Sequence, residues 1–249
     1  MRNVAAILVR ELYAYFVSPI AYFVVIPFLF VCGFFFTAAF SYFAVGTVPN
    51  APNELIGGML QTMSLLLVLV TPLLTMRLFA EEKRVGTMEL LITSPVREVE
   101  IVIGKFLSCW ALLAVMLVGT VPFPLYVRRY GNPDVPPIVT GYLGLFLLGG
   151  CLLSLGLMIS SATRNKIVAA VVTFGLGLIL WVISFLPESV GAFEGYKTIR
   201  VGLVYLSLQE HLNDFTRGVI VLKDVFFYLS FTAVCLFLTV TSVVSARWR

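Results

Sequence analysis

The chain has 249 residues, of which 60% are hydrophobic and only 12% are charged. A typical soluble domain has about 25% charged residues, so this composition excludes an ordinary soluble enzyme. The net charge of +4 comes from scattered residues and does not predict a nucleic-acid-binding surface.

Six stretches without a charged residue are long enough to cross a bilayer. A membrane-spanning helix needs about 20 predominantly apolar residues. The sequence therefore predicts an all-α, polytopic membrane protein that forms a single transmembrane domain over residues 1–249. The six predicted transmembrane helices cover about residues 20–44, 59–79, 104–127, 139–162, 167–186 and 225–246.

The remaining chain is too short to contain an ATPase domain. The longest polar connection, residues 188–223, is far shorter than the roughly 50 residues of a small domain. The sequence has no G-x-x-x-x-G-K-[ST] phosphate-binding loop, since Gly104-Lys105 is followed by Phe106. Any ATP is therefore expected on another chain, and no cofactor is expected on this one.

Residues for metal binding or nucleophilic catalysis are not apparent in the sequence. The four cysteines form no C-x-x-C pair, and a packing role is expected for each. His211 is the single histidine and is interpreted as a polar residue at the membrane interface. No acidic or basic residue is expected in the interior of a span, which argues against an ion-driven carrier. We expect a membrane subunit that is not itself an enzyme.

The N-terminal residues 2–17 predict an amphipathic helix in the membrane interface. Ser18-Pro19 fits an N-cap followed by the first residue of the first span, and Pro27 is expected to kink that span. Six spans place both termini on one side. If that side is the cytoplasm, the inner segments hold eleven of the seventeen Lys and Arg residues. The positive-inside rule therefore favours cytoplasmic termini.

Residues 77–105 carry five basic and five acidic residues, an unusual density for this chain. The second span is expected to continue as a charged helix, supported by Arg77–Glu81 and Glu81–Arg84 pairs and ended by Gly86. Thr87 would cap a short helix over 88–92, and Ser94-Pro95 would begin the next helix. The apolar side chains of the short helix suit a groove on a partner, although a solvated loop is the alternative.

The outer segment 188–223 is expected to contain an amphipathic helix. Ser207 and Glu210 fit a capping box, and Gly218 is a suitable stop. One helical stripe is formed by Leu208, Leu212, Phe215 and Val219. A structural lid is the simpler interpretation of this helix, and a contact with a ligand or partner is the alternative.

Three stretches resemble the permease subunits of type-2 ABC exporters. The first, Arg10-Glu11-Leu12 to Ser18-Pro19-Ile20-Ala21-Tyr22, is similar to the interfacial helix of that family. The second resembles its cytoplasmic coupling region and consists of Phe79-Ala80-Glu81-Glu82, then Gly86-Thr87-Met88-Glu89-Leu90-Leu91 and Ser94-Pro95. The third resembles its extracellular helix and runs from Leu206 to Asp224, with His211, Phe215, Gly218 and Val219-Ile220.

The resemblance covers nearly the whole chain and is closest to the branch that includes gliding-motility permeases and permeases for copper-enzyme maturation. It implies a second permease chain, identical or related, and separate ABC ATPase subunits that bind ATP, in a bacterial inner membrane. The residues that would meet the ATPase are Glu81, Glu82, Gly86, Thr87, Glu89, Leu90 and Leu91. The residues of the outer helix are Ser207, Glu210, His211, Phe215 and Gly218.

Three functions are compatible with these features. The first is a permease that couples ATP hydrolysis on its partners to export of an unidentified substrate. The second is a mechanotransmission subunit, in which the same movement drives an outer or periplasmic partner and no substrate crosses. The third, an ion-coupled carrier or intramembrane enzyme, is disfavoured because charged and catalytic residues are missing from the spans. The identity of the substrate does not follow from the sequence.

Overall fold

In the computed structural model, residues 2–45, 51–86, 97–131, 133–184, 202 and 205–246 are described. All regular elements within these ranges are helices, which confirms the predicted all-α class. They are α1 (Arg2–Val17), α2 (Ile20–Val45), α3 (Ala51–Thr75), α4 (Ala80–Val85), α6 (Glu98–Thr120), α7 (Pro122–Tyr130), α8 (Val135–Ala162), α9 (Lys166–Val182), α12 (Leu208–Thr216) and α13 (Leu222–Ala246).

Five helical segments in the described residues are long and apolar enough to cross a membrane. They are Ala21–Ser41, Pro52–Val85, Glu98–Tyr130, Val135–Ala162 and Leu222–Ser245. The other predicted span, 167–186, coincides with α9, which has 17 residues and ends in a turn at 183–184. Because a span needs about 20 residues, α9 is a shorter apolar helix beside five full-length ones.

Helices α3 and α6 begin well before their predicted spans, because the predicted starts avoided the charged residues. Helix α3 begins at Ala51 rather than near residue 59, with Glu54 in its first turn. Helix α6 begins at Glu98 rather than at Gly104, with Glu98 and Glu100 in its first turn. Acidic side chains are favourable there because the N-terminal end of a helix carries a partial positive charge.

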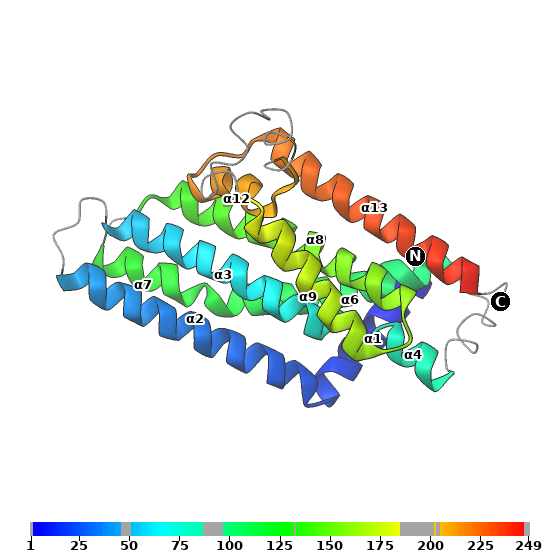
Figure 1. The fold of residues 1–249 in the computed structure, drawn as a ribbon. Coiled ribbons are helices and arrows are strands. Elements are labelled where there is room, and N and C mark those ends of the chain that lie inside the picture. Colours follow the sequence, from blue (N-terminus) through cyan, green and yellow to red (C-terminus); the bar gives the residue numbers. More distant parts are fainter. Residues whose placement is uncertain are drawn as a thin grey trace.

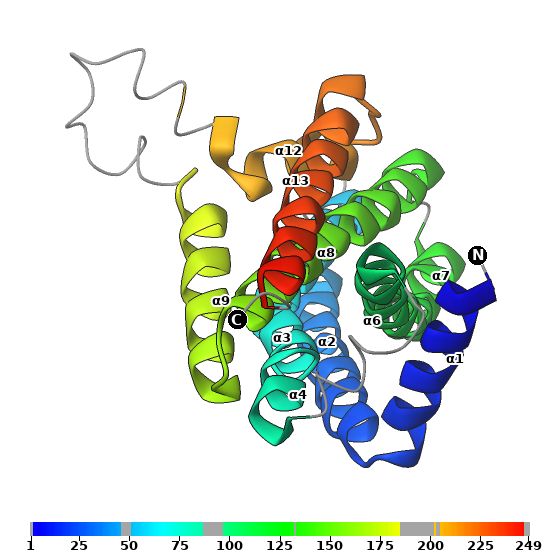
Figure 2. The same ribbon diagram turned by 90° about the vertical axis from the view of Figure 1, so that its right-hand side faces the viewer.

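Helix α8 is the centre of the bundle and packs against α3, α6, α9, α12 and α13. Figure 2 shows α9 and α1 on opposite sides of the bundle with α8 between them. Glycines of α8 face large side chains of its neighbours: Gly141 faces Leu60 of α3, and Gly149 faces Leu113 of α6. A residue with a Cβ atom would overlap these neighbours, so the glycines allow the close approach of the helices.

Replacing Gly156 of α8 by alanine is expected to lower the free energy of unfolding by about 1–3 kcal/mol, the usual effect of overpacking a core. The new Cβ would overlap the Thr75 hydroxyl and lie 2.8 Å from the Thr75 Cβ. Gly175→Ala in α9 is the matched control, because nothing lies within 4 Å of its Cβ position. Thermal unfolding in detergent, followed by tryptophan fluorescence, measures both variants. Equal unfolding temperatures would contradict the proposed α3–α8 packing.

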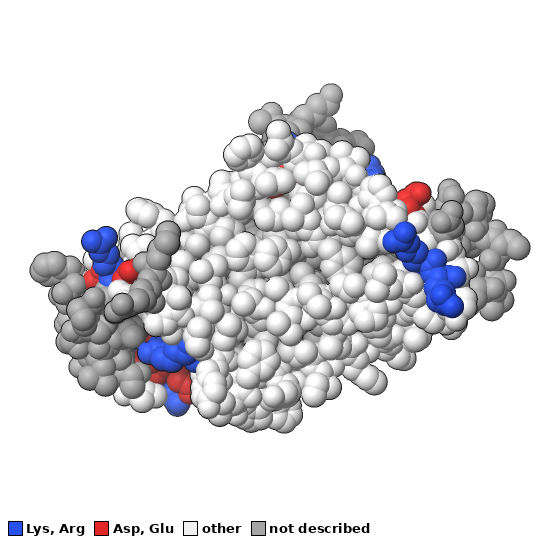
Figure 3. All heavy atoms as spheres, turned by 180° about the vertical axis from the view of Figure 1, so that it is seen from behind, with Lys and Arg blue, Asp and Glu red and all other residues white. Residues whose placement is uncertain are grey.

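The outer surface of the bundle is apolar, as expected for contact with lipid. Exposed phenylalanines of α2 include Phe23, Phe30 and Phe34, which are 76%, 72% and 61% exposed. Figure 3 shows charged side chains gathered at the two ends of one face, with a broad uncharged surface between them. A continuous apolar surface of this size is typical of a membrane protein rather than of a protein in water.

The two ends of the bundle carry different elements. Helices α1 and α4 and the last turns of α13 lie at one end, and α12 lies toward the other (Figure 1). We call them the α4 end and the α12 end. Helix α2 continues through Pro27, whereas α3 stops at Thr75 and is followed by a turn at residues 76–79 before α4. The charged helix predicted to follow the second span is α4, but a turn separates it from α3.

Candidate functional site

A buried lysine connects three helices at the α4 end. The Lys105 side chain of α6 is 1% exposed, and its Nζ lies 2.7 Å from Glu82 Oε1 of α4 and 3.1 Å from Glu11 Oε1 of α1. A buried charge is stable only when it is paired and hydrogen-bonded. The prediction that the spans contain no ionisable residue in their interior is wrong here, because the helix begins about two turns before Lys105.

The interfacial helix α1 is held to the spans by further polar contacts. Burial would raise the pKa of Glu11, but the charges of Lys105 and Arg10 together lower it below its usual value. The Tyr15 hydroxyl donates to the Leu74 carbonyl over 3.0 Å and lies 3.1 Å from Cys109 Sγ. Helix α1 is therefore attached to both α3 and α6 rather than lying loosely on the surface.

Helix α4 is also attached to the end of α8 through two serines. The backbone N–H groups of Phe79 and Ala80 both donate to Ser160 Oγ over 3.2 Å. Lys83 Nζ donates to the Ser161 carbonyl, and Ser242 of α13 donates to the same carbonyl over 3.0 Å. These contacts tie the first turn of α4 to the central helix and bring α13 to the same point.

Glu81 makes the outermost contacts of this cluster. Its Oε1 lies 3.4 Å from Arg84 and 3.6 Å from Lys166 at the start of α9. The predicted Arg77–Glu81 pair is wrong: the Arg77 guanidinium lies over the Tyr15 ring, 4.6 Å from its centroid. The turn at 76–79 separates these two residues, so the spacing of a continuous helix does not apply.

The coupling residues predicted from the sequence fall partly outside the described residues. Glu81 and Glu82 lie in α4, and Gly86 ends that helix with φ +85°, its N–H donating to the Glu82 carbonyl over 3.0 Å. This confirms the predicted stop, since glycine adopts positive φ readily. Outside the described residues lie Thr87, Glu89, Leu90 and Leu91, the predicted helix 88–92 and Ser94-Pro95. A hollow of about 200 Å³ is lined by residues of α1, α4 and α6, with Arg77 and Leu78.

The outer amphipathic helix is α12, and its predicted limits are largely correct. Ser207 is the N-cap, since its hydroxyl accepts from the Glu210 N–H over 3.3 Å. Gly218 follows the helix with φ +88°. Leu208, Leu212 and Phe215 are fully buried, but Val219 lies beyond the helix and is 53% exposed. Its assignment to the apolar stripe is wrong because the helix ends at Thr216.

His211, interpreted from the sequence as a polar residue at the membrane interface, is buried within the protein. The ring is 3% exposed and stacks on Phe227 with the centroids 4.0 Å apart. Nδ1 lies 2.6 Å from Asp224 Oδ1, and Nε2 lies 3.0 Å from the Tyr205 carbonyl. A carbonyl only accepts, so Nε2 donates. The ring therefore connects the Asp224 carboxyl at the start of α13 to the Tyr205 backbone.

Helix α12 is fixed to two spans by buried hydrogen bonds. The Tyr228 hydroxyl of α13 donates to the Leu208 carbonyl over 2.8 Å. The Thr140 hydroxyl of α8 lies 2.6 Å from the Phe215 carbonyl, close enough to donate to it. With the His211–Asp224 contact, these bonds make α12 part of the bundle, so it moves with α8 and α13.

Two functional candidates, Lys105 and Asp224, were missed because each lies next to a charge-free stretch and was taken as its boundary. A helical pattern could have found Lys105, since Lys105, Ser108, Cys109 and Leu112 share one buried face of α6. Among the described residues, no group of His, Cys, Asp or Glu is placed to hold a metal ion.

The fold defines a multi-pass α-helical membrane protein with a charged cluster at one end of its spans. The sequence matches the family described as ABC-2 family transporter protein over residues 21–246, so the chain belongs to that family. No curated protein matches it. Membership identifies a permease of the type-2 ABC class, whose partners are ABC ATPases. Its place in the gliding-motility and copper-enzyme branch stays a prediction.

Proposed function

We propose that the chain is the membrane subunit of an ATP-driven exporter, and that α4 transmits the movement of separate ATPase subunits to the spans. The observation that carries this proposal is the position of α4. It directly precedes the coupling segment and contacts α6, α8 and α9. Through Lys105 of α6, which also pairs with Glu11, it is linked to α1. A segment of six residues with these contacts cannot move without moving its neighbours.

The proposed cycle needs two copies of a permease chain and two ATPase subunits. ATP binding closes the ATPases, and the segment 87–92 moves with them. Gly86 joins this segment to α4, where Glu82 pulls on Lys105 of α6 and the Phe79 and Ala80 amides pull on Ser160 of α8. The spans then alternate between two arrangements and export a substrate. ATP is bound only by the partner chains, and this chain supplies no catalytic residue.

Coupling to ATPase subunits also defines how the chain is oriented in a bacterial inner membrane. The α4 end faces the cytoplasm, because the ATPases and their nucleotide are there. Both termini are then cytoplasmic, consistent with α1 and the last turns of α13 lying at the α4 end (Figure 1). The excess of basic residues in the inner segments supports this orientation.

The double substitution Glu89→Arg/Leu91→Asp tests this proposal. Glu89→Arg reverses a charge, and Leu91→Asp replaces an apolar side chain by an acidic one. Both changes lie in the segment that is expected to enter the ATPase groove. We expect the ATPase subunit to be lost from the purified complex while the spans remain folded, as judged by thermal unfolding. Glu54→Arg is the matched control, since it reverses an exposed charge at the first turn of α3. If ATPase co-purification and ATP-dependent activity both survive the double substitution, the proposed coupling segment is wrong.

A further inference from the structure

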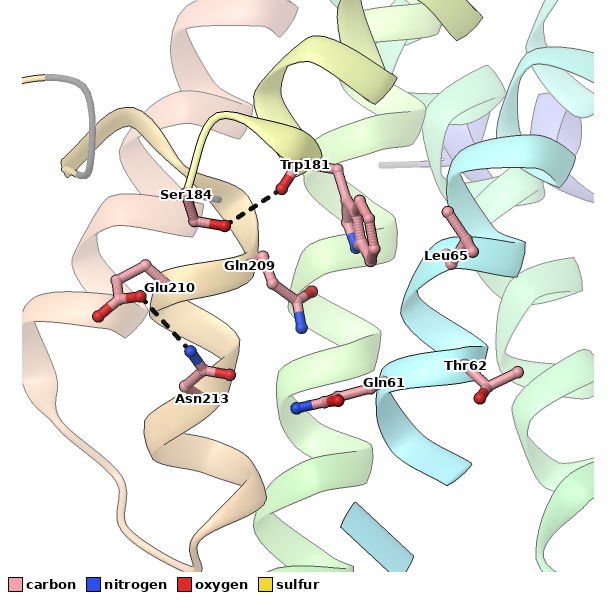
Figure 4. A pocket seen from close by; sticks show the side chains of 8 residues that line it. All are labelled: Gln61, Thr62, Leu65, Trp181, Ser184, Gln209, Glu210 and Asn213. Atoms are coloured by element: carbon pink, nitrogen blue, oxygen red, sulfur yellow. Dashed lines mark hydrogen bonds between the residues drawn. The ribbon is translucent and has the colours of Figure 1, made fainter. Parts of the chain in front are cut away.

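A polar pocket between α3, α9 and α12 has no role in the coupling described above. Its volume is about 340 Å³, within the range of about 300–1,000 Å³ that is usual for small-molecule sites. Figure 4 shows side chains from the three helices around one space. The lining residues are Gln61, Thr62, Leu65, Trp181, Ser184, Gln209, Glu210 and Asn213.

The chemistry of the lining selects against ions. Glu210 is the single charged residue of the lining, and none of the lining residues is basic, so phosphate and carboxylate groups would be repelled. One carboxylate is also too few for a metal site. The remaining polar groups are three carboxamides and two hydroxyls, which both donate and accept hydrogen bonds. A neutral ligand with many hydroxyl groups suits this set.

Gln209 shows that the pocket is built rather than incidental. The side chain is 4% exposed, and its Oε1 lies 3.1 Å from Ser64 Oγ, to which the Trp181 indole N–H donates over 3.1 Å. This chain of contacts fixes one end of the carboxamide and the plane of the indole. The amide nitrogen at the other end has no hydrogen-bond partner among the described residues and points into the pocket (Figure 4).

A second, apolar hollow lies on another side of α3. It has a volume of about 220 Å³, lies between α2 and α3, and is lined by residues such as Phe35, Phe36 and Met59. Thr62 of α3 is in the lining of both spaces, and its side chain points away from Gln61, Gln209 and Asn213 (Figure 4). The polar and the apolar space therefore lie on different sides of α3, and both are near enough for one amphiphile to contact.

We propose that the polar pocket binds a neutral, hydroxyl-rich group of the saccharide type. The carboxamides of Gln61, Gln209 and Asn213 bind its hydroxyls, and the Trp181 ring contacts the apolar face of a sugar ring. The group can come from a free oligosaccharide or from the head of a glycolipid, and the apolar hollow favours the glycolipid. Treating the ligand as cargo rests on the proposed function, whereas binding itself needs only this chain.

Binding to the purified chain in nanodiscs, without ATPase, tests the proposal. In the first experiment, maltotriose is titrated into the chain in phosphatidylcholine nanodiscs. In the second, native mass spectrometry compares how much diglucosyl-diacylglycerol and how much phosphatidylcholine stays bound to the chain. We expect saccharide binding that is weakened about tenfold or more by Gln61→Ala/Asn213→Ala, which removes hydrogen bonds at side chains that are not buried. Ser230→Ala, an exposed hydroxyl of α13, is the control and should bind as the wild type does.

The outcomes separate the two sources and leave the coupling proposal untouched. Maltotriose binding supports a free saccharide, and selective retention of the glycolipid supports a lipid head. The saccharide site would be overturned if neither maltotriose nor the glycolipid bound. It would also be overturned if the folded double variant and Trp181→Phe both bound as the wild type does, or if trialanine amide bound in preference to the saccharide. None of these results depends on whether an ATPase is bound.

Discussion

Replacing Lys105 by methionine is expected to lower the free energy of unfolding by about 3 kcal/mol. The substitution keeps most of the side-chain volume but removes the ammonium group that Glu11 and Glu82 share at 3.1 and 2.7 Å. Both carboxylates would stay mostly buried, at 15% and 22% exposure, without this partner. Thermal unfolding of the purified protein in detergent measures the loss.

An exposed lysine serves as the control, because its removal takes away the same charge without the burial. Lys166 is 41% exposed and lies 3.6 Å from Glu81, so Lys166→Met should change stability by no more than about 0.5 kcal/mol. The triple variant Lys105→Met/Glu11→Gln/Glu82→Gln also removes the two carboxylate charges that lose Lys105 as a partner, and it should recover most of the stability. If the Lys105 and Lys166 variants unfold alike, the buried cluster does not hold α1, α4 and α6 together.

His211→Leu is expected to destabilise the α12 end by a similar amount, about 3 kcal/mol. Asp224 is 4% exposed and lies in the first turn of α13, so its carboxyl would lose its partner at 2.6 Å within the bundle. Hydrogen exchange of α12 reports the local effect, and thermal unfolding reports the global one. Both should show a loss, because α12 is tied to α13 through this contact.

The double variant His211→Leu/Asp224→Leu provides the control for the histidine. Removing both polar partners takes away the unpaired carboxyl, so this variant should be more stable than His211→Leu alone. The Tyr228–Leu208 and Thr140–Phe215 hydrogen bonds remain in both variants and keep α12 in place. If the double variant is less stable than His211→Leu, the loss of stability in His211→Leu does not come from leaving the Asp224 carboxyl without its partner.

The sequence predicted the helical class and the limits of α12 because these depend on local patterns. Ser207 and Gly218 are read from capping rules, and the spans from continuous apolar runs. The break at residues 76–79 and the burial of Lys105 and His211 depend instead on which helices pack together. Lys105 is next to an apolar run in the sequence, but only the approach of α1 and α4 supplies Glu11 and Glu82.

The polar pocket could not be predicted from the sequence for the same reason. Its lining residues come from α3, α9 and α12, and Gln61 and Gln209 are far apart in the sequence. A single glutamine in an apolar helix carries no pattern that indicates a ligand. The coupling segment is the reverse case, since a local motif and a family resemblance predict it, while the described residues reach only as far as Gly86.

Native mass spectrometry of the tagged chain, purified from its own host in mild detergent, tests most directly whether separate ATPase subunits drive this permease through the α4 end. We expect a complex that contains two permease chains and a stoichiometric P-loop ATPase. A preparation without any ATPase, reproduced in lipid nanodiscs, would contradict it.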